Sequence, residues 1–300
     1  MTQHSGLLGG TTIGIGVLSW KAHHTLTASL QSYEENGFLK IFDEKVIYFS
    51  DMDDADIAIA DRFHWQHSGG PNKGIAEGMK RLAENIPCDY IVLLQNDNPI
   101  CEASEFAINH IKSAVELLQS GACDLVRLRH RWQVGESFAD ARKYLEFYPA
   151  RALSPEFNPA FHGVSGDQFN DGFGKKVHRL CRPAKAKRLR GRSVFVEEHP
   201  ENIYPDLITR EDNFLIIDSS ILHFSDQCLL ISRDLWLNVF VPYVGAARAS
   251  VRSSNGFKAP ELAINGKWWR DQGFKIAQGR GIFTHDRHDG SFRDSHKSNQ

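Results

Sequence analysis

The sequence predicts an α/β fold in which a wound sheet is flanked by helices, and three observations support this prediction. Short apolar runs rich in β-branched residues alternate with helix-compatible stretches through the first third of the chain. These runs end abruptly in glycine and small polar residues, as strands do where they meet loops. The 300 residues, 41% hydrophobic and 24% charged, have the size and composition of one globular unit with a sizeable core.

Composition and charge narrow the classes of function. The formal net charge of -2 provides no overall attraction for nucleic acid, so no nucleic-acid partner is expected. Five cysteines are spaced irregularly without a C-x-x-C pair, which favours reduced thiols over a disulfide framework or a zinc site. No window has the run of apolar residues needed to cross a bilayer. We expect a cytoplasmic protein with at most a peripheral contact to a membrane.

Strand and helix patterns follow each other in order through the first third of the chain. The apolar runs have the length and composition of strands, and the stretches between them carry apolar residues at helical spacing. Strands are predicted at residues 12–19 and 45–50 and, more weakly, at residues 62–66; helices are predicted at residues 22–36 and from Gly74 to Ile86.

The most informative segment is an apolar run that breaks into polar residues. Residues 90–95 are predominantly apolar and are followed by Asn96, Asp97, Asn98 and a proline. A buried strand that ends with one carboxylate among amides is suited to hold a hydrated divalent cation and the phosphates bound to it. This segment predicts phosphate-ester chemistry at the end of a strand.

Polar groups follow the other predicted strands as well. Ligands of open α/β sheets bind beyond the carboxyl ends of the strands, so these groups should meet. The glycine-rich residues 69–74 open a helix whose free amides attract phosphate, although such loops are also ordinary turns. Asp51 and Asp53 fit either turn capping or a hydrogen bond to a nucleobase or ribose. The candidate ligand-binding residues are Ser19, Trp20, Asp51, Asn72, Lys73, Gly74, Gln95 and Asn96.

Four segments in the same order resemble the nucleotide-sugar-dependent glycosyltransferases of the GT-A fold, most closely their large family 2. The segments are residues 15–20 (IGVLSW), 48–51 (YFSD), 70–76 (GPNKGIA) and 90–98 (YIVLLQNDN). The resemblance implies a GT-A, Rossmann-like mixed sheet in a single compact domain with acceptor-side insertions. It also implies that the eight candidate residues above bind a nucleotide-sugar donor.

The last of these segments falls on the Asp-x-Asp signature of that family, whose final aspartate binds a divalent metal that bridges the donor diphosphate. Asp97 stands at the final aspartate and Gln95 at the first. The resemblance therefore implies that Asp97 binds Mn²⁺ or Mg²⁺. A neutral amide at Gln95 removes one negative charge, so we expect a lower affinity for the metal than two carboxylates would give.

The resemblance returns near the carboxyl end of the chain. Pro260 and Glu261 precede a helix-compatible stretch, and short apolar runs follow up to His285. In related enzymes an acidic residue at the start of this helix is the general base, and a histidine after the following strand completes the metal shell. These positions are Glu261 and His285. Proline is typical of a first helical turn, where the positive end of the helix favours an ionised Glu261, although such acids are also common there without a catalytic role.

One departure leaves a second candidate for the base. The family usually shows Glu-Asp at the start of the helix, and here Leu262 follows Glu261. Glu211 and Asp212 therefore form a competing acidic pair. The polar residues from His285 to Gly290 fit no standard zinc pattern, so only His285 is taken as a metal ligand.

The middle of the chain offers fewer motifs. Its aromatic residues suit either a core or stacking on sugar rings. Residues 175–192, from Lys175 to Arg192, are densely basic without an acid. This suits a solvated loop, contact with an anionic donor, an anionic membrane surface or an acidic glycan, or nonspecific binding of nucleic acid. Further strands are predicted at residues 221–225 and 228–232, and a short helix at residues 233–239.

The expected function is that of an inverting hexosyl- or pentosyltransferase moving a sugar from a UDP or GDP donor to a hydroxyl of a glycan or other acceptor. A catalytically silent nucleotide-sugar-binding homologue is the alternative, and a nucleic-acid-binding protein the remote one. The expected organisation is a flexible tail at 1–10, a donor half at 11–130, an acceptor half at 131–285 and a polar tail at 286–300.

Overall fold

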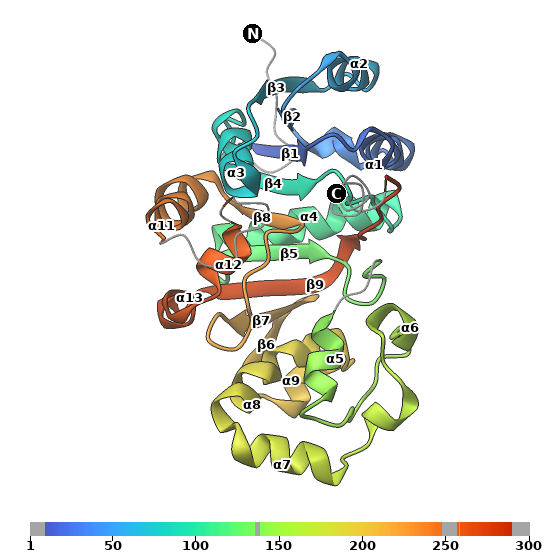
Figure 1. The fold of residues 1–300 in the computed structure, drawn as a ribbon, viewed down its shortest axis with the longest axis vertical. Coiled ribbons are helices and arrows are strands. Elements are labelled where there is room, and N and C mark those ends of the chain that lie inside the picture. The colour runs from blue at the N-terminus through green and yellow to red at the C-terminus, as the bar shows by residue number, and fades with distance from the viewer. Residues whose placement is uncertain (1–9, 136–138, 248–256, 258, 290–300) are drawn as a thin grey trace, which may run out of the picture.

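The computed structural model describes residues 10–135, 139–247, 257 and 259–289, and within them a single mixed sheet runs through the molecule (Figure 1). Its strand order is β3-β2-β1-β4-β8-β5-β9-β7-β6. β7 and β8 run antiparallel to the strands beside them, and the β1–β4 and β5–β9 pairs are parallel. The strands are β1 (Ile13–Ser19), β2 (Glu44–Ser50), β3 (Gln66–Gly70), β4 (Tyr90–Gln95), β5 (Leu125–Arg129), β6 (Ile208–Glu211), β7 (Phe214–Asp218), β8 (Leu229–Ser232) and β9 (Lys275–Phe283).

Helices flank the sheet and also build a lobe beyond β6, at the lower end of Figure 1. The flanking helices are α1 (His23–Asn36), η1 (Phe38–Ile41), α2 (Asp54–Arg62), α3 (Gly74–Glu84), α4 (Ser104–Gln119), α10 (Arg233–Leu235), η4 (Trp236–Phe240), α11 (Val241–Ala246), α12 (Pro260–Ile264) and α13 (Lys267–Gln272). The helical lobe contains α5 (Ala139–Leu145), α6 (Pro159–His162), η2 (Gly166–Phe169), α7 (Phe173–Cys181), α8 (Pro183–Leu189), η3 (Arg190–Phe195) and α9 (Pro200–Ile203).

The core consists of two apolar clusters, one on each face of the sheet. One cluster joins α1 and α4 to the sheet through residues such as Leu30 and Ile111. The other joins α3, η4 and α13 to the opposite face and continues into the helical lobe, for example through Leu82 and Trp269. The α/β fold with a mixed sheet flanked by helices, expected from the sequence, is confirmed.

Two glycines of β1 let α3 lie close to the sheet. A Cβ atom at Gly14 would stand 2.2 Å from Ile86, and one at Gly16 would stand 2.7 Å from Leu82. Side chains at these positions would push α3 outwards, which in a packed core costs about 1–3 kcal/mol. The close approach sets where the amino end of α3 meets the ends of β1 and β2.

Two predicted strands are wrong, and hydrogen bonds explain both errors. A strand was expected at residues 62–66, but α2 runs to Arg62 and the N–H groups of Phe63, His64 and Trp65 bond back to carbonyls of that helix, so β3 begins only at Gln66. Residues 221–225 form turns instead, because the N–H groups of Ile221 and Leu222 both bond to the carbonyl of Asp218.

Other sequence expectations hold. All five cysteines are free thiols, and three of them are buried. No helix in the described part of the chain is long and apolar enough to cross a membrane. Residues 1–9 and 290–300, which make up most of the two predicted tails, lie outside the described residues.

Candidate functional site

The turn after β4 is held in place by α1. Ser29 Oγ donates a hydrogen bond of 2.7 Å to the carbonyl of Asn96, and Tyr33 Oη donates one of 2.6 Å to the carbonyl of Asn98. The Asn98 side chain in turn accepts a bond from the N–H of Gln95. The carbonyls of the residues before and after Asp97 are thus both bonded to α1, which fixes the backbone of the turn that carries this carboxylate.

Asp97 is buried, with 1% of its surface exposed, and its Oδ2 atom faces two cationic or potentially cationic groups. His285 Nε2 lies 3.1 Å away, and Arg287 Nη2 bonds to the same oxygen. Burial alone would raise the pKa of Asp97, but His285 and Arg287 outweigh it, and the pKa is lowered. The group is therefore a carboxylate at neutral pH, and the structure brings Asp97 and His285 together as the sequence predicted.

The other carboxylate oxygen of Asp97 gives a test of whether a metal fits. Oδ1 is buried and has no hydrogen-bond partner among the described residues. One carboxylate and one imidazole, with the remaining positions left to donor phosphates and water, suit Mn²⁺ or Mg²⁺. These residues fit a divalent cation, although the Arg287 guanidinium competes for Oδ2.

The ends of β1, β2 and β3 are tied together through Asp51. Its N–H bonds to the carbonyl of Gly70, and its Oδ1 accepts the N–H of Asn72 at 2.8 Å. Its Oδ2 accepts a bond from the Trp20 indole at 3.3 Å. Both carboxylate oxygens of Asp51 thus have partners within the protein, so its geometry favours the alternative role in organising turns over the predicted role as an acceptor for a base or ribose.

The remaining candidate donor residues lie at the same edge. Ser19 is buried, and its Oγ accepts a bond from the Asn96 side chain at 3.3 Å. The Asn72 side chain accepts the N–H of Gly74, which has φ 84° and begins α3. Lys73 is exposed just before this helix, where the free amides of the first turn favour an anion. Gln95, at the end of β4, is half-buried.

Glu261 lies in the first turn of α12, next to Pro260 at the first position. The Asn265 side chain closes this helix against the loop before β8 with bonds of 2.7 and 2.8 Å to the backbone N–H and carbonyl of Phe224. The same loop carries Asp226, which is 6% exposed. Burial raises the pKa of Asp226 well above its usual range, and the charges of Glu261 and Asp97 raise it further. Asp226 is therefore harder to ionise than an ordinary carboxyl group, because it is buried close to the negative charges of Glu261 and Asp97.

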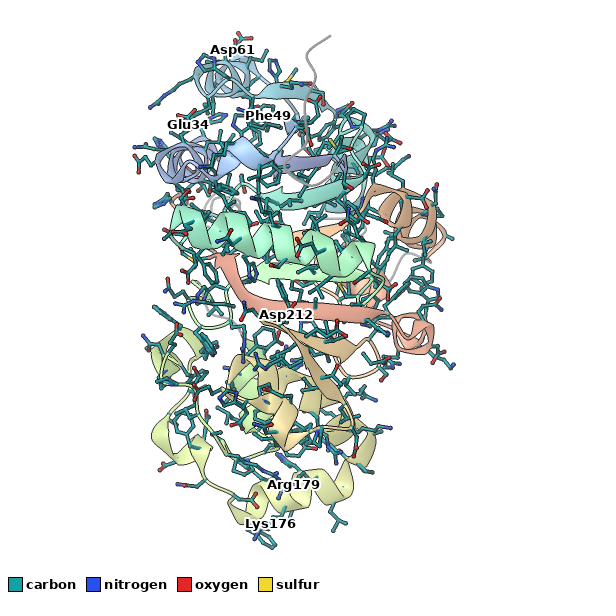
Figure 2. All side chains as sticks on the ribbon, turned by 180° about the vertical axis from the view of Figure 1, so that it is seen from behind. Glu34, Phe49, Asp61, Lys176, Arg179 and Asp212 are labelled. Carbon is teal, nitrogen blue, oxygen red and sulfur yellow. The ribbon has the colours of Figure 1, made fainter. Side chains whose placement is uncertain are left out.

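The competing acidic pair lies in a different setting. Glu211 and Asp212 are exposed at the turn that connects β6 and β7, at the outer edge of the sheet, and Asp212 has a positive φ of 50°. Asp212 can be found in Figure 2, where it is labelled. The sequence suggests either Glu261 or this pair as the base, and Glu261 is the candidate whose charge acts on the buried Asp226.

A second acidic group near the same edge has metal-ligand residue types. The candidate ligand atoms of His23, Asp53 and Asp56 lie within 4.8 Å of one another. However, Lys21 Nζ is 2.6 Å from Asp53, and the side chains of Asp53 and Asp56 form a capping box at the start of α2. These carboxylates are already neutralised and hydrogen-bonded by the protein.

Residues 287–289 bond to α1 and to Asp97, whereas the sequence predicts a polar tail from residue 286 onwards. The N–H of Thr25 donates to Asp289 Oδ2 at 2.8 Å, and Thr25 Oγ1 accepts from the N–H groups of His288 and Asp289. This docking on α1 brings Arg287 onto Asp97. Sequence reasoning missed Arg287, whose only signal is its place two residues after His285, and Asp226, which stands just before the apolar run of β8.

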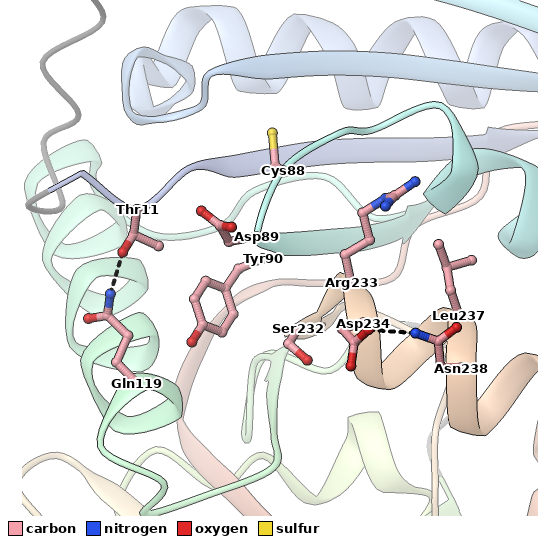
Figure 3. A pocket seen from close by; sticks show the side chains of 10 residues that line it. All are labelled: Thr11, Cys88, Asp89, Tyr90, Gln119, Ser232, Arg233, Asp234, Leu237 and Asn238. Carbon is pink, nitrogen blue, oxygen red and sulfur yellow. Dashed lines mark hydrogen bonds between the residues drawn. The ribbon is translucent and has the colours of Figure 1, made fainter.

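A pocket of about 560 Å³ lies away from these residues, at the opposite edge of the sheet (Figure 3). It is lined by residues that include Asp89 and Arg233, from the start of β4 and the end of β8. Asp89 Oδ2 accepts bonds from the N–H and the hydroxyl of Thr12, and Arg233 Nε donates to the carbonyl of Ala83. Its charged groups serve the fold, so this pocket does not compete with the strand ends as the candidate site.

No family model matches the chain, and no curated protein matches it. Residues 1–349 of TarS from S. aureus align with 92% of this chain at 10% identity and a TM-score of 0.48, and the chain spans 60% of the length of that structure. Glucosyl-3-phosphoglycerate synthase from Mycobacterium tuberculosis was solved with Mn²⁺, UDP and glucosyl-3-phosphoglycerate. The alignment covers 93% of this chain and 73% of the synthase chain, at 14% identity and a TM-score of 0.43. The mannosyltransferase PcManGT from Pyrobaculum calidifontis was solved with GDP-Man and Mn²⁺. The alignment covers 40% of this chain and 36% of the mannosyltransferase chain, at 12% identity and a TM-score of 0.33.

Proposed function

We propose that the protein is an inverting glycosyltransferase that moves a sugar from a nucleoside diphosphate donor, UDP- or GDP-linked, to a hydroxyl group of an acceptor. The observation that carries this proposal is the buried, ionised Asp97, whose Oδ1 has no partner among the described residues and which lies at the edge where the ends of β1 to β4 meet. The order of the four sequence segments and the binding rule for open α/β sheets support the same conclusion.

On the donor side, Asp97 and His285 would hold a divalent cation, which supplies positive charge to the leaving diphosphate. Arg287 lies beside Asp97, and Lys73 lies just before α3. They stabilise negative charge that develops on the diphosphate as its bond to the sugar breaks. Ser19, Trp20, Asn72, Gln95 and Asn96 are the residues that we propose to bind the nucleoside part of the donor.

On the acceptor side, Glu261 is the general base. The acceptor oxygen attacks the anomeric carbon as the bond from that carbon to the diphosphate oxygen breaks, and Glu261 takes the hydroxyl proton. Attack on the face opposite to the leaving group inverts the anomeric configuration. The raised pKa of Asp226 reduces the negative charge that this carboxyl group places beside Glu261.

The experiment is a thermal-shift panel of nucleoside diphosphates with and without Mn²⁺, followed by an assay of donor hydrolysis. A ligand that binds the folded state raises the melting temperature by mass action. We expect UDP or GDP to stabilise the protein only when Mn²⁺ is present, and expect slow release of nucleotide from the matching sugar donor. Stabilisation without release of nucleotide would instead identify a silent binding homologue, and no stabilisation by either nucleotide would refute the proposal.

A further inference from the structure

Helix α7 turns its apolar side chains towards solvent. Phe173 is 81% exposed, Leu180 is 82% exposed, and Val177 is 36% exposed. Their spacing of four and three residues places them on one face of the helix, and we refer to these three residues as the apolar ridge. A surface helix ordinarily turns such a face towards the core, and no described residue of α7 is buried.

The opposite face of α7 is anchored by cations. Lys175 Nζ donates to the carbonyls of Tyr148, at 3.1 Å, and Gln168. Arg179 donates to the carbonyl of Phe147 at 2.6 Å and pairs with Asp171 at 2.9 Å. These bonds fix the rotation of the helix, so the exposure of the apolar ridge is a built feature of the lobe.

Basic residues accompany the ridge. Between Asp171 and Glu197 the chain contains no acidic residue. Some of its cations are engaged within the protein, as Lys175 and Arg179 are. Others on α7, on α8 and at the corner between these helices are exposed, and we refer to them as the basic set: Lys176, Arg182, Lys187 and Arg188.

The position of α7 suits a flat partner. The helix lies at one end of the longest axis of the molecule in Figure 1, and Lys176 lies at that same end in Figure 2, far from Asp61. A planar surface can therefore reach α7 without first meeting the sheet. A second copy of the chain would bring the two basic sets together, which is unfavourable.

We propose that α7 and α8 form a docking surface for an anionic lipid bilayer. The apolar ridge enters the boundary between headgroups and acyl chains, and the basic set lies among anionic headgroups. Both contributions are needed, because a short helix with three apolar side chains inserts weakly and surface charges alone are screened by salt. This surface is separate from the strand ends and does not depend on the proposed function.

The test is flotation of the full chain with phosphatidylcholine vesicles that do or do not contain phosphatidylserine. We expect binding only to the anionic vesicles and expect high salt to weaken it. The double variant Phe173→Ser, Leu180→Ser should bind at least about tenfold more weakly. Reversing the charge of Lys176 and Arg182 to Glu should weaken binding by at least about fivefold for each residue.

Leu153→Ser is the matched control, because Leu153 is 42% exposed elsewhere in the lobe. It should bind as the unchanged chain does, and all these variants should keep the melting temperature, since they replace exposed side chains. Equal binding to neutral vesicles, or no binding to either kind, would overturn the proposal. So would a dimer in light scattering that the double variant dissolves, since that outcome assigns the ridge to a second copy of the chain.

Discussion

Two clusters near the carboxyl ends of the strands combine carboxylates with histidine: the Asp97 cluster (Asp97, His285 and Arg287) and the Asp53 cluster (Lys21, His23, Asp53 and Asp56). The carboxylate oxygens of the two clusters are bonded differently. Asp53 and Asp56 are used by the cap of α2, by Lys21 and by His23. Asp97 is buried in a turn whose neighbouring carbonyls bond to α1, and its Oδ1 has no partner among the described residues. Residue types alone therefore do not identify a site. The Asp53 cluster has more carboxylates, but in the Asp97 cluster Oδ1 of Asp97 has no hydrogen-bond partner among the described residues.

The largest effect is expected at Asp97. In Asp97→Asn the side chain keeps its shape but loses the charge that balances the cation, so turnover should fall by about 10³- to 10⁴-fold. The stabilisation of UDP or GDP binding by Mn²⁺ should disappear as well. Steady-state kinetics and thermal shift measure both effects.

The matched variant for this comparison is Asp53→Asn, which should keep both turnover and the Mn²⁺ effect. If Asp53→Asn were the variant that abolished the Mn²⁺ effect, the metal would belong to the Asp53 cluster and the assignment to Asp97 would be wrong.

A second contrast, between Glu261 and Glu211, carries the next largest effect. Glu261 lies in the first turn of α12 and its charge acts on the buried Asp226, whereas Glu211 is exposed at the outer edge of the sheet. Glu261→Gln should lower turnover by about 10²- to 10³-fold with little change in donor affinity, because only proton removal is lost. Glu211→Gln and Asp212→Asn should leave turnover unchanged. An inactive Glu211→Gln beside a fully active Glu261→Gln would move the base to the hairpin.

Arg287 tests how the Asp97 cluster is balanced. Its guanidinium and a metal would compete for the same oxygen of Asp97. Arg287→Ala should therefore lower the dissociation constant of Mn²⁺ by roughly tenfold. Titration calorimetry without nucleotide measures this change. Arg280→Ala is the control, because Arg280 pairs with Glu102 and Glu156 and not with Asp97. An increase in the Mn²⁺ requirement of Arg287→Ala would show that Arg287 organises the site instead of competing for it.

The sequence predicted the parts of the site that depend on local patterns and missed those that depend on strand order. β1 and β4 could be recognised because an apolar run breaks into polar residues, and Asp97 follows from that break. The contact of Arg287 with Asp97 joins residues 190 positions apart and requires β9 to lie beside β5, which no local pattern indicates. Residues 221–225, just before Asp226, were predicted as a strand because their apolar residues resemble one, whereas their backbone is bonded to Asp218 and Asn265.

The smallest expected effect is a change in melting temperature at Asp53, which would identify the Asp53 cluster as structural. Lys21 and the N–H of Asp56 lower the pKa of Asp53 to about 2 in the folded protein. A group whose pKa is lower in the folded than in the unfolded chain stabilises the fold above its unfolded pKa of about 4, and this contribution is lost as the pH falls towards 2. Asp53→Asn keeps the ability to cap α2 but loses the partly exposed pair with Lys21, so the melting temperature at neutral pH should fall by no more than a few degrees. Between pH 4 and pH 2 the difference between the two proteins should shrink; a difference that instead grew on acidification would mean that Asp53 is protonated more readily in the folded chain than in the unfolded one.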